Sequence, residues 1–226
     1  MKIFIDTAIV EEIKEASQYG VISGVTTNPS LLAKSNRLLN DVIQDILKLV
    51  DGPISAEVTE SDYMTMYNQA HQIVEMTNNN PNITIKLPMT IDGIKTCKML
   101  SNEGIKTNVT LIFSVSQALL AMEAGATFIS PFMGRVDDYL PNEVNPGAKL
   151  IEEINKVKNM YGYKSKIIAA SIRNVKHVEQ ACLAGADIAT IPFKVIKQMY
   201  EHELTTRGLK IFSEANKKWN KFIIHF

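Results

Sequence analysis

Apolar and polar positions alternate along the chain with two different periods. Eight short apolar runs of strand type recur, at residues 2–6, 22–27, 53–59, 83–88, 107–113, 127–132, 166–171 and 187–192. The stretches between them, such as 38–50 and 118–124, have apolar residues three and four positions apart, which is the spacing of a helix with one buried face. The pattern therefore predicts strands that alternate with helices.

Glycine marks the ends of several predicted helices. Each of five helix-like stretches is followed by a glycine, at Gly20, Gly104, Gly125, Gly162 and Gly185. Glycine just past a helix adopts the left-handed cap conformation at little cost. Side-chain chemistry and periodicity therefore predict the same boundaries.

The predicted strands are apolar on both faces, as in a parallel sheet that helices cover. Eight such units favour an α/β fold, a single (β/α)8 TIM barrel over residues 1–226, for which about 250 residues is typical. An open doubly wound sheet is the alternative, but the G-x-G-x-x-G fingerprint expected after its first strand is absent. The sequence of residues 205–226 predicts an additional C-terminal helix and tail. Such a segment packs on its own barrel or on a neighbouring subunit.

Composition narrows the classes of function. The 24 Lys and Arg residues balance 24 Asp and Glu residues, so net charge favours neither nucleic acid nor an anionic membrane as partner. The N-terminus is too charged for a signal peptide, and no segment has the roughly 18 uninterrupted apolar residues of a membrane helix. We therefore expect a cytoplasmic protein, in which Cys97 and Cys182 are buried free thiols.

Polar side chains collect at the C-terminal ends of seven consecutive predicted strands. They are Asp6, Thr26, Thr27, Asn28, Glu57, Lys86, Asn108, Thr110, Ser130, Arg135, Ser171 and Arg173. Solvation explains any one of them, because strand ends approach water. In a closed barrel, however, these ends and the loops after them form the active site. The set therefore predicts a site at this end of the barrel.

Lys86 is the most informative of these residues, because it lies inside the apolar run ITIKLP. Burial disfavours a charged ammonium group and favours the neutral amine, which can attack a carbonyl and form a Schiff base. A structural ion pair with Glu57 on the adjacent strand explains the same position equally well. Spacing alone leaves both interpretations open.

Other chemistries have less support. The four histidines, His71, His177, His202 and His225, are scattered without metal-ligand spacing, so no metal site is predicted. Arg135 and Arg173 follow the sixth and seventh strands, and with Ser171 they suit a phosphate group. The alternative is that these arginines pair with Asp137, Asp138 or a carbonyl at the surface.

Several motifs resemble those of one family. They are DT at 6–7, GVTTNPSLLAK at 24–34, AEV at 56–58, ITIKLPMT at 83–90, the long segment 104–138, and IIAASIRNVKHV at 167–178. In this order, without gaps from residue 1 to about residue 210, they resemble the small bacterial transaldolases, a short branch related to the fructose-6-phosphate aldolases. The resemblance implies an (α/β)8 barrel, sugar-phosphate substrates and Schiff-base chemistry without metal or cofactor.

The resemblance also implies a role for each matching residue. Lys86 is the expected nucleophile, Asp6 the acid/base at the C4 hydroxyl, and Glu57 and Thr110 the residues that hold a proton-shuttling water. Residues expected to bind substrate are Thr27, Asn28, Asn108, Ser130 and Phe132, and those expected to bind its phosphate are Arg135, Ser171 and Arg173.

Two positions favour a transferase over an aldolase. Aldolases of this family are expected to have glutamine where this chain has Glu57, and tyrosine where it has Phe132. A tyrosine hydroxyl would help to protonate the bound three-carbon enamine, whereas phenylalanine leaves it to wait for an acceptor aldehyde. A non-catalytic sugar-phosphate-binding barrel is the alternative from another class. Short relatives also form rings, commonly of ten subunits, so we expect a homo-oligomer, with a decamer as one form.

Overall fold

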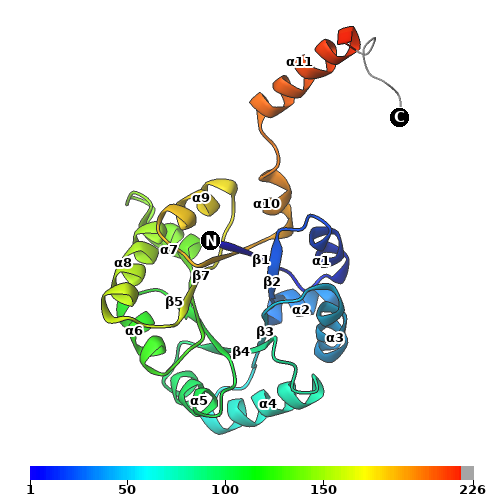
Figure 1. Cartoon of the computed structure of the whole chain (residues 1–226). Helices are drawn as coiled ribbons and strands as arrows, with labels where there is room; N and C mark the ends of the chain where they lie inside the picture. The colour runs from blue at the N-terminus through cyan, green and yellow to red at the C-terminus, as the bar shows by residue number, and fades with distance from the viewer. Residues whose placement is uncertain (220–226) are drawn as a thin grey trace.

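A computed structural model describes residues 1–219 as a closed parallel barrel with helices on its outside (Figure 1). The strands follow one another around the barrel as β1 (Lys2–Asp6), β2 (Ile22–Thr26), β3 (Ile54–Glu57), β4 (Ile83–Pro88), β5 (Thr107–Ile112), β6 (Phe128–Pro131), β7 (Lys166–Ala169) and β8 (Ile188–Ile191). The last strand pairs with the first, with Ile191 opposite Ile5. The predicted TIM barrel is confirmed, and the open sheet is excluded.

Eleven helices accompany these strands in the described residues. They are α1 (Val10–Ser17), α2 (Pro29–Ser35), α3 (Leu39–Leu49), α4 (Tyr63–Met76), α5 (Ile91–Asn102), α6 (Val115–Glu123), α7 (Met133–Tyr139), α8 (Pro146–Tyr161), α9 (Val175–Leu183), α10 (Phe193–Gln198) and α11 (Glu203–Trp219). The stretches predicted at 38–50 and 118–124 correspond to α3 and α6. All five predicted cap glycines have positive φ angles, between 70° and 90°, so these boundaries are confirmed.

The barrel interior is filled in layers, as the period-2 alternation of its strands requires. Phe4, Phe128, Ile168 and Ile188 form one buried apolar cluster, in which the two phenylalanine rings lie edge to face at 6.3 Å. Gly24 on β2 leaves room for this cluster, because a Cβ atom there would lie 2.5 Å from the Phe4 ring. The apolar layer closes the barrel beneath its C-terminal end.

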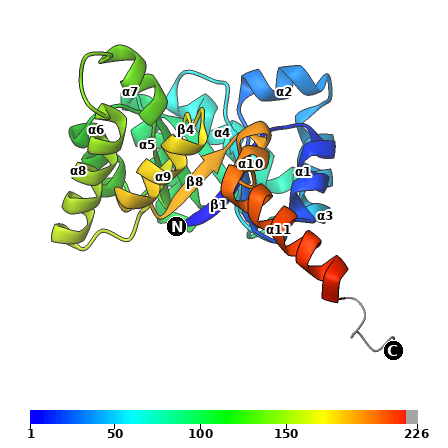
Figure 2. The same ribbon diagram turned by 90° about the horizontal axis from the view of Figure 1, so that it is seen from above.

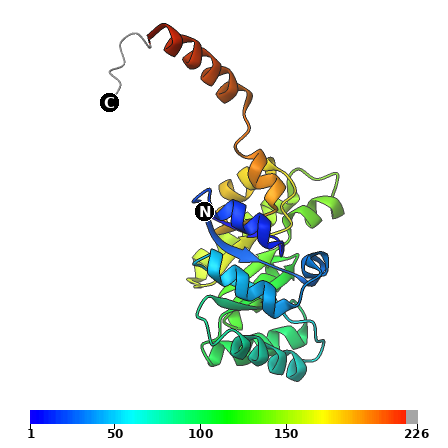
Figure 3. The same ribbon diagram turned by 90° about the vertical axis from the view of Figure 1, so that its right-hand side faces the viewer.

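The helix α11 stands away from the barrel in two perpendicular views (Figures 1 and 3). It begins two residues before the predicted start at residue 205, and residues 220–226 of the predicted tail lie outside the described residues. Leu204, Leu209, Ile211 and Phe212 of this helix are each more than 60% exposed. The helix therefore presents apolar side chains that its own barrel does not cover.

Within residues 1–219, none of the helices combines the length and the apolar character needed to cross a bilayer. Cys97 is a buried free thiol, as predicted, whereas Cys182 is exposed. The prediction for Cys182 was wrong because it lies on the outer side of α9, one residue before the 88% exposed Leu183.

Candidate active site in the barrel mouth

A cavity opens at the C-terminal ends of the strands. The helices α2 and α7 lie at this end of the barrel and the N-terminus at the other (Figure 2). The cavity consists of two adjoining hollows of about 170 and 310 Å³, which share five lining residues, among them Lys86. A combined space of several hundred cubic ångströms suits a small organic ligand.

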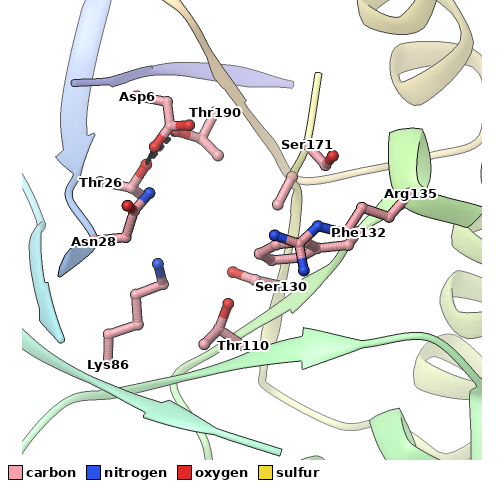
Figure 4. Close-up of a pocket in the computed structure, with 11 residues that line it drawn as sticks. Asp6, Thr26, Asn28, Lys86, Thr110, Ser130, Phe132, Arg135, Ser171 and Thr190 are labelled. Atoms are coloured by element: carbon pink, nitrogen blue, oxygen red, sulfur yellow. Dashed lines mark hydrogen bonds between the residues drawn. The ribbon is translucent and has the colours of Figure 1, made fainter. Parts of the chain in front are cut away.

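Most of the residues predicted from the strand ends line this cavity. The inner hollow is lined by the predicted residues Asp6, Thr26, Asn28, Lys86, Thr110, Ser130, Phe132, Arg135 and Ser171, and the outer hollow also by Glu57. Three predicted residues, Thr27, Asn108 and Arg173, lie outside both linings. The close-up shows the Lys86 amine directed into the space between Asn28 and Thr110 (Figure 4).

Lys86 is 5% exposed and extends from β4 into the cavity. Its Nζ atom lies 2.8 Å from Glu57 Oε2 and donates a 3.1 Å hydrogen bond to the carbonyl oxygen of Thr27. Strand register explains the first contact, since Glu57 and Lys86 occupy paired positions on β3 and β4. The two interpretations of Lys86 are thus compatible: the ion pair with Glu57 is present, and the amine faces the cavity.

Asp6 at the end of β1 lies across the cavity from Lys86. Burial raises the pKa of the Asp6 carboxyl group, while a hydrogen bond from Thr26 and the charge of Lys86 lower it and the charge of Glu57 raises it further. Thr26 Oγ1 donates that hydrogen bond to Asp6 Oδ1 at 2.8 Å. A carboxyl group with a raised pKa, held within a cavity, is suited to accept and return a proton.

Thr110 has a buried hydroxyl group that faces the same cavity. Within the described residues its Oγ1 atom has no hydrogen-bond partner. The next residue, Leu111, has a φ angle of 61°, and the pairing of β5 with β6 shifts register between Val109 and Ile112. Left-handed backbone is strained for a leucine and is often found at functional sites. The irregular end of β5 therefore presents a hydroxyl group that is free to bind a ligand.

Asn28 and Asn108 have different surroundings. Asn28 caps α2, because its Oδ1 atom accepts a 3.0 Å hydrogen bond from the Leu31 amide, which leaves its amide nitrogen for the cavity. Asn108 is fully buried beneath the cavity, where it accepts from Ser130 Oγ at 2.8 Å and donates to Ser55 Oγ at 3.2 Å. Asn108 thus orients Ser130, and Ser130 lines the cavity.

Arg135 is the cationic group on the α7 side of the cavity. Its guanidinium carbon lies 5.2 Å from the centre of the Phe132 ring, within the range of a cation–π contact. The ring in turn packs edge to face on Phe113 at 5.9 Å. This stacking fixes the arginine over an apolar wall, in position for an anionic group (Figure 4).

Ser171 and Arg173 follow β7, but only Ser171 lines the cavity. The guanidinium group of Arg173 makes a two-pronged ion pair with the Asp138 carboxylate on α7, so the surface pairing left open by the sequence is present. Ser171 has a left-handed φ angle of 60°. Its backbone lies against Gly134, where a Cβ atom would be 2.1 Å from the Ser171 carbonyl oxygen. Close approach of α7 and this loop therefore requires glycine.

Asp137, next to Asp138, serves the packing of the helices. Its Oδ1 atom accepts a 2.9 Å hydrogen bond from the Gly147 amide, and Oδ2 lies 3.3 Å from His177 Nε2. Burial lowers the pKa of His177, partly opposed by the charge of Asp137. The two neighbouring aspartates thus connect α7 with α8 and α9 and with the loop that carries Arg173.

Thr190 lines the inner hollow and was not among the predicted site residues. It lies on β8, 4% exposed, with its Oγ1 atom 2.5 Å from Thr26 Oγ1. The sequence contained a signal for it. Thr190 is the polar residue of the apolar run IATI and lies two positions after Ile188 of the inner apolar cluster, just as Asp6 lies two positions after Phe4.

A metal site would need several acidic, histidine or cysteine side chains close together. In the part of the chain that the structure describes, no group of three or more of them is arranged to hold a metal ion. The polar groups in the cavity are instead an amine, hydroxyl groups, one amide, a guanidinium group and two carboxyl groups. Such a set can bind a polyhydroxylated anion and move protons on it.

Comparisons with known proteins agree on one family. A sequence profile described as Transaldolase/Fructose-6-phosphate aldolase matches residues 3–223. Relatives named "Probable transaldolase" include that of Agathobacter rectalis, 55% identical over 94% of this chain and 95% of its own, and that of Carboxydothermus hydrogenoformans, 55% identical over 94% and 96%. The Geotalea uraniireducens relative is 53% identical over 98% and 99%.

A solved structure supports the fold alone. A mutant mandelate oxidase with a monooxide FMN adduct superimposes with a TM-score of 0.58 at 12% identity, over 85% of this chain and 64% of that one. At this identity the likeness extends to the barrel and to nothing of its chemistry.

Proposed function

Since this chain belongs to the transaldolase/fructose-6-phosphate aldolase family, we propose that it is a transaldolase. It transfers a dihydroxyacetone unit from sedoheptulose 7-phosphate to glyceraldehyde 3-phosphate, which gives erythrose 4-phosphate and fructose 6-phosphate. The observation that carries this proposal is the 5% exposed Lys86, whose amine lies in a cavity opposite Asp6 and 2.8 Å from Glu57.

In the first step Lys86 Nζ attacks the ketose carbonyl. The ammonium group first gives a proton to Glu57, directly or through a water molecule that Glu57 and Thr110 bind. The neutral amine forms a carbinolamine, and return of the proton to its hydroxyl group releases water and leaves an iminium ion. The buried hydroxyl of Thr110 and the contact of Glu57 with Lys86 support these two roles.

In the second step the Asp6 carboxylate takes the proton from the C4 hydroxyl group. The C3–C4 bond breaks, its electron pair moves into the iminium group, and the aldose leaves with a new carbonyl at its former C4. The resulting enamine attacks the carbonyl of the acceptor aldose, and Asp6 returns its proton to the new hydroxyl group. Hydrolysis of the iminium ion then frees Lys86 and the product ketose.

Binding of the sugar phosphate uses the remaining polar groups. The amide of Asn28 and the hydroxyl of Ser130 bind substrate hydroxyl groups, with Asn108 orienting Ser130 and Thr27 holding Lys86 through its carbonyl oxygen. Arg135 and Ser171 bind the phosphate from the α7 side of the cavity. Arg173 joins them by exchanging its partner Asp138 for the phosphate, which is also a bidentate acceptor.

Phe132 supports transfer over release of free dihydroxyacetone. Its ring lines the inner hollow beside Arg135 and has no hydroxyl group with which to protonate the enamine. The intermediate therefore persists until an acceptor aldehyde arrives. Aldolase activity and non-catalytic sugar-phosphate binding are the outcomes against which the proposal is tested.

The test is the intact mass of the protein after incubation with fructose 6-phosphate and borohydride. We expect a reduced three-carbon adduct on the wild type and none on Lys86→Met, together with transfer to erythrose 4-phosphate. Absence of the adduct from the wild type, with thermal stabilisation by fructose 6-phosphate, would instead support a binding barrel. Release of free dihydroxyacetone without transfer would support an aldolase.

We also propose that the chain acts in the cytoplasm as a homo-oligomer, with a decamer as one form. The exposed apolar side chains of α11, including Leu209 and Phe212, support assembly because isolated subunits gain from covering them. Light scattering at micromolar concentration tests this, and a monomer would contradict it.

A further inference from the structure

Three side chains form a chain of hydrogen bonds that joins β8, β2 and β1 at the cavity. Thr190 Oγ1 lies 2.5 Å from Thr26 Oγ1, and Thr26 Oγ1 lies 2.8 Å from Asp6 Oδ1 (Figure 4). Thr190 and Thr26 are 4% and 2% exposed. Strand order explains the contact, because β1 pairs with β2 on one side and with β8 on the other.

The number of hydrogen atoms available determines which group donates in each of these hydrogen bonds. A threonine hydroxyl group has one hydrogen atom to donate. When Asp6 is ionised it can only accept, so Thr26 donates its hydrogen to Asp6 Oδ1. The short contact between the two hydroxyl groups then requires Thr190 to donate to Thr26.

We propose that Thr190 is a positioning residue for the acid/base Asp6 and acts on it through Thr26. The inference rests on the proposed function, in which Asp6 takes the proton of the C4 hydroxyl group. By donating to Thr26, Thr190 prevents the Thr26 hydroxyl group from rotating away. The hydrogen of that hydroxyl group therefore stays directed at Asp6 Oδ1. Oδ2 of Asp6 is then the oxygen that faces the substrate.

The hydrogen bond from Thr190 also strengthens the hydrogen bond that Thr26 donates to the Asp6 carboxylate. A hydroxyl group that accepts one hydrogen bond is a better donor in the next, by roughly 10–30% per bond. Thr190 therefore favours the ionised form of Asp6, against the burial that raises the Asp6 pKa. Removing the Thr190 hydroxyl should raise that pKa further, because the carboxylate then loses part of its stabilisation.

The charged groups around Asp6 lie on other elements. Lys86 on β4 and Glu57 on β3 act on it with opposite signs, and Arg135 from α7 lines the same hollow. The two strands paired with β1, Ile22–Thr26 and Ile188–Ile191, contain no ionisable residue. A change at Thr190 thus alters the hydrogen bonding of Asp6 without removing a charge near it.

The test compares Thr190→Val with Thr190→Ser. Valine has nearly the shape of threonine without the hydroxyl group, whereas serine retains the hydroxyl group without the methyl. For Thr190→Val we expect the acid limb of the pH profile of kcat/KM to move upward by roughly 0.3–0.6 pH unit, and kcat to fall roughly three- to tenfold. Thr190→Ser should keep the wild-type limb and a kcat within about twofold of wild type.

A second measurement does not depend on turnover. The Asp6 carboxyl carbon is titrated by NMR in ¹³C-aspartate-labelled protein and assigned with Asp6→Asn. Its titration midpoint should move upward in Thr190→Val and not in Thr190→Ser. Thr190→Ala replaces the valine variant if circular dichroism shows that the latter is unfolded.

The outcomes separate this inference from the proposed function. An unmoved pH limb and an unmoved Asp6 titration in Thr190→Val would overturn the role of Thr190, even where borohydride still traps an adduct on Lys86. Failure of the wild type itself to form that adduct would overturn the proposed function. A fall in kcat that Thr190→Ser does not rescue would mean that Thr190 only fills space.

Discussion

The ammonium group of Lys86 lies 2.8 Å from the carboxylate of Glu57, and the two residues occupy paired positions on adjacent strands. Both side chains are largely buried, with side-chain exposures of 7% and 14%. A buried pair of this kind stabilises little, but removal of one partner leaves the other charge without compensation. The pair keeps a proton within reach of Lys86, the proposed nucleophile.

Glu57→Gln tests whether that proton is used. The variant keeps the shape of the side chain and removes the proton acceptor, so we expect kcat for transfer to fall roughly 10²-fold, with slower formation of the borohydride-trapped adduct. Quenched-flow trapping measures the second effect. Glu60→Gln, at an exposed position three residues along, is the matched control. Equal trapping rates in wild type and Glu57→Gln would show that Glu57 is only a counter-charge.

Phe132→Tyr should change the fate of the three-carbon intermediate. A hydroxyl group on this ring would enter the cavity that Phe132 lines and deliver a proton to the enamine. We expect free dihydroxyacetone to be released from fructose 6-phosphate at a rate roughly tenfold or more above wild type. Phe113→Tyr adds the same hydroxyl to the ring that packs on Phe132, outside the lining of the inner hollow, and should leave release unchanged. Equal release by both variants would reject the role of Phe132.

Asp138→Asn tests the exchange of partners at Arg173. In the proposed binding mode Asp138 competes with the phosphate for this guanidinium group, so neutralisation of Asp138 should lower KM for sugar phosphates, with kcat unchanged. Exposed ion pairs contribute about 0–1 kcal/mol, which limits the change to about fivefold. Steady-state kinetics with phosphorylated and unphosphorylated acceptors measures this, because only KM for the phosphorylated acceptor should change. A higher KM would mean that Asp138 holds Arg173 in place for the phosphate.

Gly134→Ala should disturb the loop that carries Ser171. A Cβ atom at this position would meet the Ser171 carbonyl oxygen at 2.1 Å, so α7 and the loop must separate. We expect KM for phosphorylated substrates to rise roughly tenfold, because Ser171 and Arg135 would no longer converge. Gly208→Ala, where a Cβ atom would meet nothing within 4 Å, is the control. Unaltered KM in Gly134→Ala would place the phosphate elsewhere.

Asp6→Asn should stabilise the fold while abolishing transfer. Burial raises the pKa of Asp6 in the folded protein above its value in the unfolded chain. The stability that Asp6 contributes is therefore fully present below the pKa of the unfolded state. It is lost as the pH rises through the pKa of the folded state. Asparagine does not ionise and still accepts the hydrogen bond from Thr26. At neutral pH we expect the free energy of unfolding to increase by about 1 kcal/mol.

Denaturant titrations from about pH 5 to about pH 8 measure this difference. It should widen as pH rises and narrow as pH falls, because protonated Asp6 and asparagine are both neutral. A difference that stays constant over this range would show that ionisation of Asp6 does not destabilise the folded protein.

The strands and the barrel were predictable because their signal is local. Each strand is an apolar run bounded by turn residues or a cap glycine, and the observed bounds lie within two residues of the predicted ones. The short helices α2, α7 and α10 were not predicted. With six or seven residues, each has too few turns to display a period.

The site residues that lie at the ends of regular strands were predictable from the sequence. Lys86, Asp6 and Glu57 extend from regular strands, so their position in the chain fixes where their side chains lie. Arg173 differs, because its direction depends on Asp138, which is 35 residues away in the sequence. The sequence left Asp138 open as one of several partners for the arginines, because strand position does not reveal which one is bound. Thr190, by contrast, had a local signal in its alternation with Ile188, although it carries no charge and lies before the predicted strand end at residue 192.

The pairing of β1 with β8 also has a consequence for the order of events during synthesis. Residues 2–6 are synthesised long before residues 188–191, the strand that completes their surroundings. Until then β1 has an unpaired edge. The contact between Thr26 and Thr190, which lie 164 residues apart in the sequence, is also missing beside Asp6. The hydrogen bonds around the proposed acid/base are therefore completed only in the step that closes the barrel.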